Sequence, residues 1–212
     1  MTRPILYSFR RCPYAMRARL AIASAGVECE LREIVLRDKA PQFLEASPKG
    51  TVPVVVAGNT VIEESFDVMQ WALTQNDPEG LMDMPDVGLD WIKRSDGPFK
   101  HNLDRTKYAT RYPDTDPGTG RENASVFLRD LNVQLTDKTW MFGDKPTLAD
   151  LAILPFVRQF ANIDRTWFDT QPWPHLIGWL DRFLQSERFL RIMDKHPKWV
   201  AGDPVKTFPI RR

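Results

Sequence analysis

The stretch Ser8–Gly26, SFRRCPYAMRARLAIASAG, decides the fold because it joins a short apolar run to a helical pattern through a Cys-Pro pair. The preceding residues 4–9, PILYSF, predict a buried strand. Pro13 suits the first position of a helix, where its missing N–H and fixed φ cost nothing. Gly26 suits the left-handed residue that ends a helix. Cys12 is therefore expected to be the N-cap of the first helix.

An N-cap cysteine has a particular chemistry. Its thiolate faces unpaired backbone N–H groups and the positive end of the helix dipole, and Arg10, Arg11 and Arg17 lie within about a turn of it. Cysteines in such settings titrate at about 3.5 to 7.5 instead of about 8.5. The local sequence leaves open whether Cys12 is a nucleophile or a buried, inert cysteine. Ala15 stands where a CxxC motif has its second cysteine, so a mixed disulfide on Cys12 would need an external thiol to resolve it.

The rest of the chain divides into an α/β part and a helical part. The first part predicts the order strand, helix, strand, helix, hairpin, helix (βαβαββα), and prolines and a glycine at 76–85 then break the pattern. Long amphipathic patterns follow. We predict an α/β domain over residues 1–78, a linker over 79–85 and an all-helical domain over 86–212. The further strands are expected at 29–36, 51–56 and 60–62, and the further helices of the first domain at 41–46 and 65–75.

Composition and charge exclude several classes of function. Lys plus Arg number 29 against 28 for Asp plus Glu, so no bulk field would recruit nucleic acid or an acidic membrane. No run reaches the ~18 apolar residues of a membrane span, and the start of the sequence is not that of a secretory signal. We expect a cytoplasmic protein with free thiols at Cys12 and Cys29 and a small-molecule partner. His101, His175 and His196 lack metal-ligand spacing, so no metal site is predicted.

Two other positions suggest ligand contacts. Pro53 inside TVPVVV removes a ladder donor, so that strand lies at a sheet edge there or the bond after Val52 turns sharply, as a cis bond would. Either geometry leaves the backbone of Val52 available to a peptide-like ligand, although the proline taken alone favours an edge strand without a ligand. Ser65 is expected to cap the third helix, whose start suits a carboxylate. Glu64 beside it suits an ammonium group. Ser65 taken alone is explained by helix capping without any ligand.

In their order and spacing, these segments resemble the cytosolic glutathione transferase superfamily. The resemblance is carried by CPYA at 12–15, VP at 52–53, ES at 64–65 and GDKPTLADLAILPFV at 143–157. It covers nearly the whole chain and implies a thioredoxin-like first domain and an all-helical second domain. Cysteine at the head of CPYA resembles the omega-type transferases and the two-domain glutaredoxins. The chain departs from the former in lacking their extended N-terminal segment and from the latter's CPYC form at Ala15.

The resemblance implies residue roles. Cys12 would be the catalytic thiol and glutathione the co-substrate. Lys39 would pair with the glycine carboxylate of glutathione, and the backbone of Val52 ahead of cis-Pro53 with its cysteinyl part. Glu64 and Ser65 would hold the γ-glutamyl head. The full set of residues implied around the tripeptide is Tyr14, Leu36, Lys39, Val52, Pro53, Glu64 and Ser65.

We therefore predict a glutathione-dependent thiol transferase or reductase. Cys12 would accept a glutathionyl group from a mixed disulfide, or reduce a dehydroascorbate-type substrate, and a second glutathione would regenerate it. One alternative is conjugation of glutathione to electrophiles, assisted by Tyr7 at the end of the first strand. Another is a non-catalytic binding or regulatory adaptor, because a fold does not fix an activity. The second substrate is expected to be a small electrophile or disulfide. The superfamily implies a homodimer, and the two-domain glutaredoxins a monomer.

Overall fold

The computed structural model describes residues 2–114 and 116–209, which form two compact units. One unit combines Met1–Gly80 with Ser186–Arg212, and the other is Leu81–Gln185. This division differs from the predicted helical domain over 86–212, because the last part of the chain returns to the first unit and adds a strand to its sheet. The predicted thioredoxin-like order of the first domain and the helical nature of the second are confirmed.

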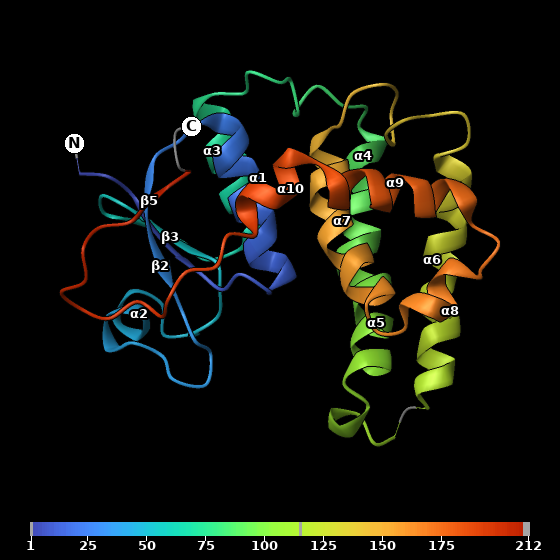
Figure 1. The fold of residues 1–212 in the computed structure, drawn as a ribbon, viewed down its shortest axis with the longest axis horizontal. Coiled ribbons are helices and arrows are strands. Elements are labelled where there is room, and N and C mark those ends of the chain that lie inside the picture. The colour runs from blue at the N-terminus through green and yellow to red at the C-terminus, as the bar shows by residue number, and fades with distance from the viewer. Residues whose placement is uncertain (1, 115, 210–212) are drawn as a thin grey trace. The chain divides into compact units, whose positions relative to one another are not determined.

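The first unit is a five-stranded mixed sheet with helices packed on it (Figure 1). The strand order is β4-β3-β1-β2-β5, with β1 and β2 parallel and the other pairs antiparallel. Helices α1 and α3 pack together on one face, and α2 lies on the other. The elements are β1 (Ile5–Ser8), α1 (Pro13–Ala25), β2 (Cys29–Glu33), α2 (Pro41–Ala46), β3 (Val54–Ala57), β4 (Thr60–Ile62), α3 (Ser65–Gln75), α10 (Glu187–Ile192) and β5 (Thr207–Phe208).

Two predicted strands have different bounds in the structure. The strand expected at 29–36 ends at Glu33, and the one expected at 51–56 begins only at Val54, after the proline. Because β3 lies between β1 and β4, Pro53 does not mark an edge strand. The peptide bond between Val52 and Pro53 is cis, which is the other geometry that the sequence allowed. Gly26 has a φ of 68° and ends α1 as predicted.

Strand β5 has no signal in the sequence. It contains only Thr207 and Phe208, which is too short for an alternating pattern. Phe208 pairs with Cys29 on β2, and the Leu31 N–H donates to the Lys206 carbonyl at 2.7 Å. The C-terminal segment thus covers the edge of β2, which would otherwise expose unpaired backbone groups.

The second unit is helical. Its α7 begins with a capping box formed by Thr147 and Asp150. The fully buried Asp150 carboxylate also accepts hydrogen bonds from the Met141 N–H and from the Trp179 indole N–H, both at 2.9 Å. The elements are α4 (Val87–Arg94), a π-helical segment Ser95–Phe99, α5 (Lys100–Lys107), a 3-10 turn Ala109–Arg111, α6 (Pro117–Gln134), α7 (Leu148–Ala161), α8 (Arg165–Asp169) and α9 (Pro174–Gln185).

Candidate functional site

Helix α1 begins where the Cys-Pro pair predicted. Cys12 is the N-cap, with extended φ and ψ of −76° and 124°, and Pro13 follows as the first helical residue. The Cys12 carbonyl accepts the first helical hydrogen bond from the Met16 N–H at 2.9 Å, and the Cys12 N–H donates to the Phe9 carbonyl at 3.0 Å. The half-buried thiol therefore sits at the positive end of a 13-residue helix.

The thiol lies beside the backbone of Val52. Cys12 Sγ is 3.8 Å from the Val52 carbonyl oxygen, on the residue that precedes the cis bond to Pro53. Val52 is buried in a core cluster that also contains Tyr7 and Phe43, and Cys12 packs against that cluster. Cys12 and Val52, two predicted site residues that lie far apart in the sequence, are thus brought together.

The arginines around Cys12 point elsewhere than expected. Arg10 donates from its guanidinium to the Met193 carbonyl at 3.2 Å, and Arg11 lies over the Phe9 ring. Arg17 is buried in α1 and reaches Ser65 Oγ at 3.5 Å. The guanidinium groups of Arg10 and Arg17 thus bond to uncharged partners and keep their positive charge, and the N-terminus of α1 adds a partial positive charge at Cys12.

The start of α3 has a different cap from the predicted one. Glu64 is the N-cap residue and Ser65 is the first helical residue. Ser65 is buried against Arg17, whereas Glu64 is exposed and accepts a hydrogen bond from Lys49 Nζ at 2.7 Å. Lys49 was not identified from the sequence. This ion pair raises the pKa of Lys49, mainly through the hydrogen bond to Glu64.

Lys39 and Leu36 lie in the exposed loop after β2. Lys39 extends over Gly50. Its Nζ lies only 2.9 Å from the place that a Cβ on this glycine would take. Gly50 has a φ of 60° and precedes Val52 by two residues. The Lys39 ammonium is therefore near the segment that leads to Val52. Tyr14 lies half-buried in the first turn of α1.

The hydroxyl groups at the end of β1 are both engaged in the protein. Tyr7 Oη accepts a hydrogen bond from Arg32 at 2.7 Å and lies 3.4 Å from the Gln42 carbonyl. Ser8 Oγ accepts one from the Arg19 guanidinium at 2.7 Å. Neither hydroxyl is presented to a ligand in this arrangement.

Cys29 lies in a different environment from Cys12. Its side chain is fully buried at the start of β2, and burial raises its pKa from 9.0 to about 12. A thiol in that environment is protonated and inaccessible at neutral pH. Cys29 is thus a core residue.

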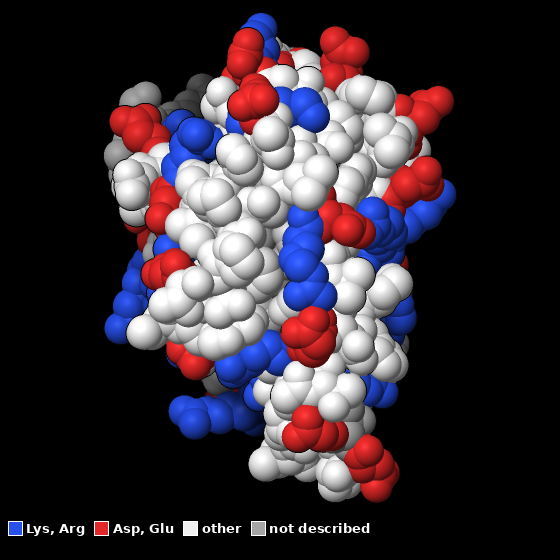
Figure 2. Space-filling view, turned by 90° about the vertical axis from the view of Figure 1, so that its right-hand side faces the viewer, with Lys and Arg blue, Asp and Glu red and all other residues white. Residues whose placement is uncertain are grey.

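The described residues 2–114 and 116–209 contain no cluster of metal-ligating side chains. No three His, Cys, Asp or Glu side chains gather there as metal ligands would, and no helix there is long and apolar enough to cross a membrane. The face in Figure 2 carries Lys and Arg interspersed with Asp and Glu around uncharged residues. That face has no field of a single sign.

Comparisons with known proteins match both halves of the chain. The glutathione S-transferase N-terminal domain model matches residues 6–80, and the corresponding C-terminal domain model matches residues 120–182. A probable glutathione S-transferase, parA, of Nicotiana tabacum is 26% identical over 207 residues, which is 93% of this chain and 92% of the relative.

Solved structures with low sequence identity share the fold. A glutathione transferase family member from Pseudomonas fluorescens pf-5, solved with two glutathione molecules bound, has a TM-score of 0.76 at 16% identity, with 90% of this chain and 92% of that chain covered. Glutathione transferase Omega 3C from Trametes versicolor also has a TM-score of 0.76, at 19% identity, with coverages of 91% and 84%.

Proposed function

Because the chain belongs to the glutathione S-transferase superfamily, we propose that it is a glutathione-dependent thiol transferase whose nucleophile is Cys12. The observation that carries this proposal is the thiol at the N-cap of α1, 3.8 Å from the Val52 carbonyl oxygen. A thiolate is stabilised at a helix start, and it is the thiolate that attacks a disulfide. Free glutathione in a reducing cytoplasm would be the co-substrate.

The other site residues support a bound tripeptide. The Val52 backbone suits the peptide groups of the cysteinyl part, which would bring the glutathione sulfur to Cys12. Lys39, near Gly50, suits the glycine carboxylate. Exposed Glu64 suits the γ-glutamyl ammonium, and the N-terminus of α3 at Ser65 suits the adjacent carboxylate. Tyr14 and Leu36 would flank the tripeptide.

The proposed reaction has two exchange steps. The Cys12 thiolate attacks the glutathionyl sulfur of a mixed disulfide, a Cys12–glutathione disulfide forms, and the substrate thiolate leaves and takes a proton. A second glutathione thiolate then attacks the glutathione sulfur of that disulfide, so that oxidised glutathione leaves and the Cys12 thiolate returns. Ala15 offers no internal thiol, and buried Cys29 offers none either, so the second step uses external glutathione.

A Cys12→Ser variant tests the proposal. Its deglutathionylation of a glutathionylated peptide should fall to background, while glutathione binding by calorimetry should change little. Cys29→Ser is the matched control and should retain the activity. Full deglutathionylation by Cys12→Ser would contradict the proposal.

Conjugation of glutathione to electrophiles is a second candidate, because several relatives are named glutathione S-transferases. An aryl halide assay separates the two reactions: conjugation by Cys12→Ser at the wild-type rate, without deglutathionylation by the wild type, would favour this candidate. An adaptor without turnover would show neither.

A homodimer, which the superfamily supports, would show twice the 24.5 kDa chain mass in light scattering.

A further inference from the structure

A buried ion pair contacts the loop that carries Cys12. Arg19 on α1 and Glu33 at the end of β2 form a salt bridge, and their side chains are only 1% and 9% exposed. The Glu33 carboxylate also accepts a hydrogen bond at 2.7 Å from the backbone N–H of Arg10, two residues before the thiol. Neither charged group is assigned a role by the proposed chemistry.

The pair fixes the chain on both sides of Cys12. Before the thiol, Arg19 donates to Ser8 Oγ at 2.7 Å and Glu33 accepts from the Arg10 N–H at 2.7 Å. After the thiol, Arg19 is itself part of α1, seven residues on. The end of β1, the following loop and the first two turns of α1 are therefore joined through one guanidinium and one carboxylate.

The C-terminal segment closes this network. The Ile192 carbonyl accepts a hydrogen bond from Arg19 at 3.0 Å, and the Met193 carbonyl accepts one from the Arg10 guanidinium at 3.2 Å. Further along, the Trp199 N–H donates to the Glu33 carbonyl at 2.9 Å. These contacts bury the ion pair under a segment that the sequence assigned to the other domain.

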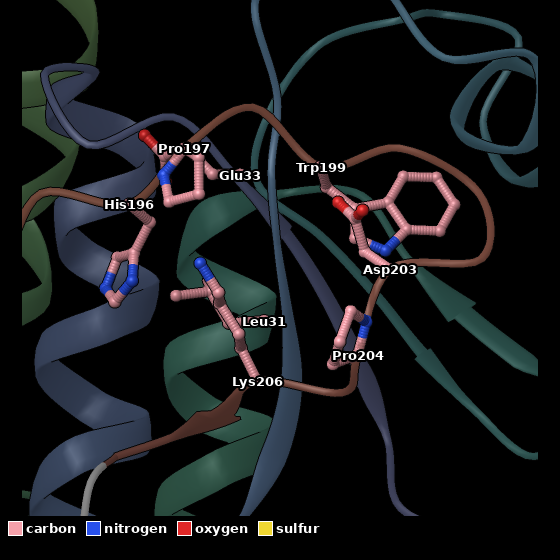
Figure 3. A pocket seen from close by; sticks show the side chains of 8 residues that line it. All are labelled: Leu31, Glu33, His196, Pro197, Trp199, Asp203, Pro204 and Lys206. Atoms are coloured by element: carbon pink, nitrogen blue, oxygen red, sulfur yellow. The ribbon is translucent and has the colours of Figure 1, made fainter.

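A hollow with a volume of about 230 Å³, open solvent included, lies beside Glu33 (Figure 3). Leu31 and Glu33 of β2 line it together with His196, Trp199 and Lys206 of the C-terminal segment. The ionisable groups near the pair are Arg10, Asp194, His196, Asp203 and Lys206. Burial, followed by the charge of Arg19, lowers the pKa of His196, so this histidine is neutral at pH 7 and adds no positive charge beside Arg19.

Stability alone is a weak reason for such a pair. The cost of desolvating two charges offsets much of their attraction, and buried ion pairs often contribute little net stability. The hydrogen bonds of this pair converge on residues that flank the candidate nucleophile. We propose that Arg19 and Glu33 are positioning residues, which hold the loop at residues 9–12 so that Cys12 stays at the N-cap of α1 and beside Val52.

The proposal rests on the proposed function only in taking Cys12 as the reactive thiol. The experiment therefore measures alkylation of Cys12 by iodoacetamide against pH, with Cys12→Ser as the blank, and not turnover. In Glu33→Ala the loop loses its acceptor and the thiol loses its fixed place at the helix start. Its half-maximal rate should move toward about pH 8.5, and its rate at a pH well below both midpoints should fall about tenfold for each unit of the shift.

Two conservative variants keep the test decisive. Glu33→Gln keeps an oxygen that accepts from the Arg10 N–H, so its rate at pH 7 should stay within about threefold of the wild type, equivalent to half a unit. Arg19→Lys keeps the charge but lacks the planar fork that reaches Ser8, Glu33 and Ile192 together, so its profile should shift in the same direction as that of Glu33→Ala. It is also the variant to use should Glu33→Ala fail to fold.

Asp150→Asn is the matched control, because it disturbs a buried carboxylate of the second unit. It should lower the unfolding temperature without moving the alkylation profile. Wild-type profiles in Glu33→Ala and Arg19→Lys would overturn the positioning role, whatever the transferase activity is. Shifted profiles in a protein that transfers no thiol would reject the proposed function and keep the positioning role.

Discussion

The hydroxyl of Tyr7 on β1 accepts a 2.7 Å hydrogen bond from Arg32, its register partner on β2. The same guanidinium lies 4.2 Å from the centre of the Trp199 ring, in a cation–π contact with the C-terminal segment. Tyr7 is only 2% exposed. The Tyr7 hydroxyl, which the sequence offers as an alternative catalytic group, is thus part of the packing between the sheet and its last segment.

Replacing Tyr7 by Phe should therefore affect stability more than activity. The ring would keep its contacts with Phe43, but Arg32 would lose one acceptor, at a cost of about 1 kcal/mol. Thermal unfolding and glutathione-dependent turnover measure the two effects. A loss of turnover of a hundredfold or more, with glutathione still bound, would assign the catalytic hydroxyl to Tyr7 and contradict the Cys12 account.

Lys39→Gln should weaken glutathione binding about tenfold or more, since hydrogen bonds to charged groups are worth about 1.5 to 3 kcal/mol. Titration calorimetry gives the dissociation constant. Lys145→Gln is the matched control, because it removes an exposed lysine from the second unit and changes the net charge equally. Equal affinities of the two variants would remove Lys39 from the site.

Asp150→Ala should destabilise the second unit strongly. The substitution leaves the N–H groups of Met141 and Thr147 and the Trp179 indole N–H buried without their acceptor. Each such group costs about 1 to 3 kcal/mol, so the free energy of unfolding should fall by about 3 kcal/mol or more. Urea unfolding checks this, with exposed Asp144→Ala as the control. A loss below 1 kcal/mol would mean that the capping box contributes little.

Because its thiol is buried, Cys29 should make the folded protein less stable at alkaline pH. Burial raises its pKa from 9.0 to about 12, so the thiol binds its proton more tightly when folded. This contribution is fully present below pH 9 and is lost as pH rises from 9 toward 12, at about 1.4 kcal/mol for each unit of difference. The free energy of unfolding of Cys29→Ala should fall less over that range than that of the wild type. If the free energies of unfolding of the two proteins fell in parallel over that range, the loss would not come from Cys29.

Local signals predicted much of this molecule. Pro13 and Gly26 marked both ends of α1, because capping depends on a few adjacent residues. The two-residue β5 carries no periodicity, so its return to β2, and with it the place of the C-terminal segment in the first unit, could not be read from the sequence. The cap at α3 was displaced by one residue, to Glu64.

The site was harder to predict than the fold, because its partners come from distant segments. Proximity of Cys12 to Val52 followed from the family pattern, whereas the Lys49–Glu64 pair and the Arg19–Glu33 pair depend on tertiary packing. Arg19 lies on the buried face of α1, seven residues after Cys12. A charged residue among apolar helix positions was the one signal that pointed to a buried partner.

The alkylation rate of Cys12 against pH, with and without S-methylglutathione, tests most directly whether Cys12 is a reactive thiolate in a glutathione site. Cys12→Ser is the blank, and buried Cys29 should not react in the folded protein. We predict a half-maximal rate well below pH 8.5 and protection by the glutathione analogue. A half-maximal rate at or above pH 8.5, without protection, would contradict the account.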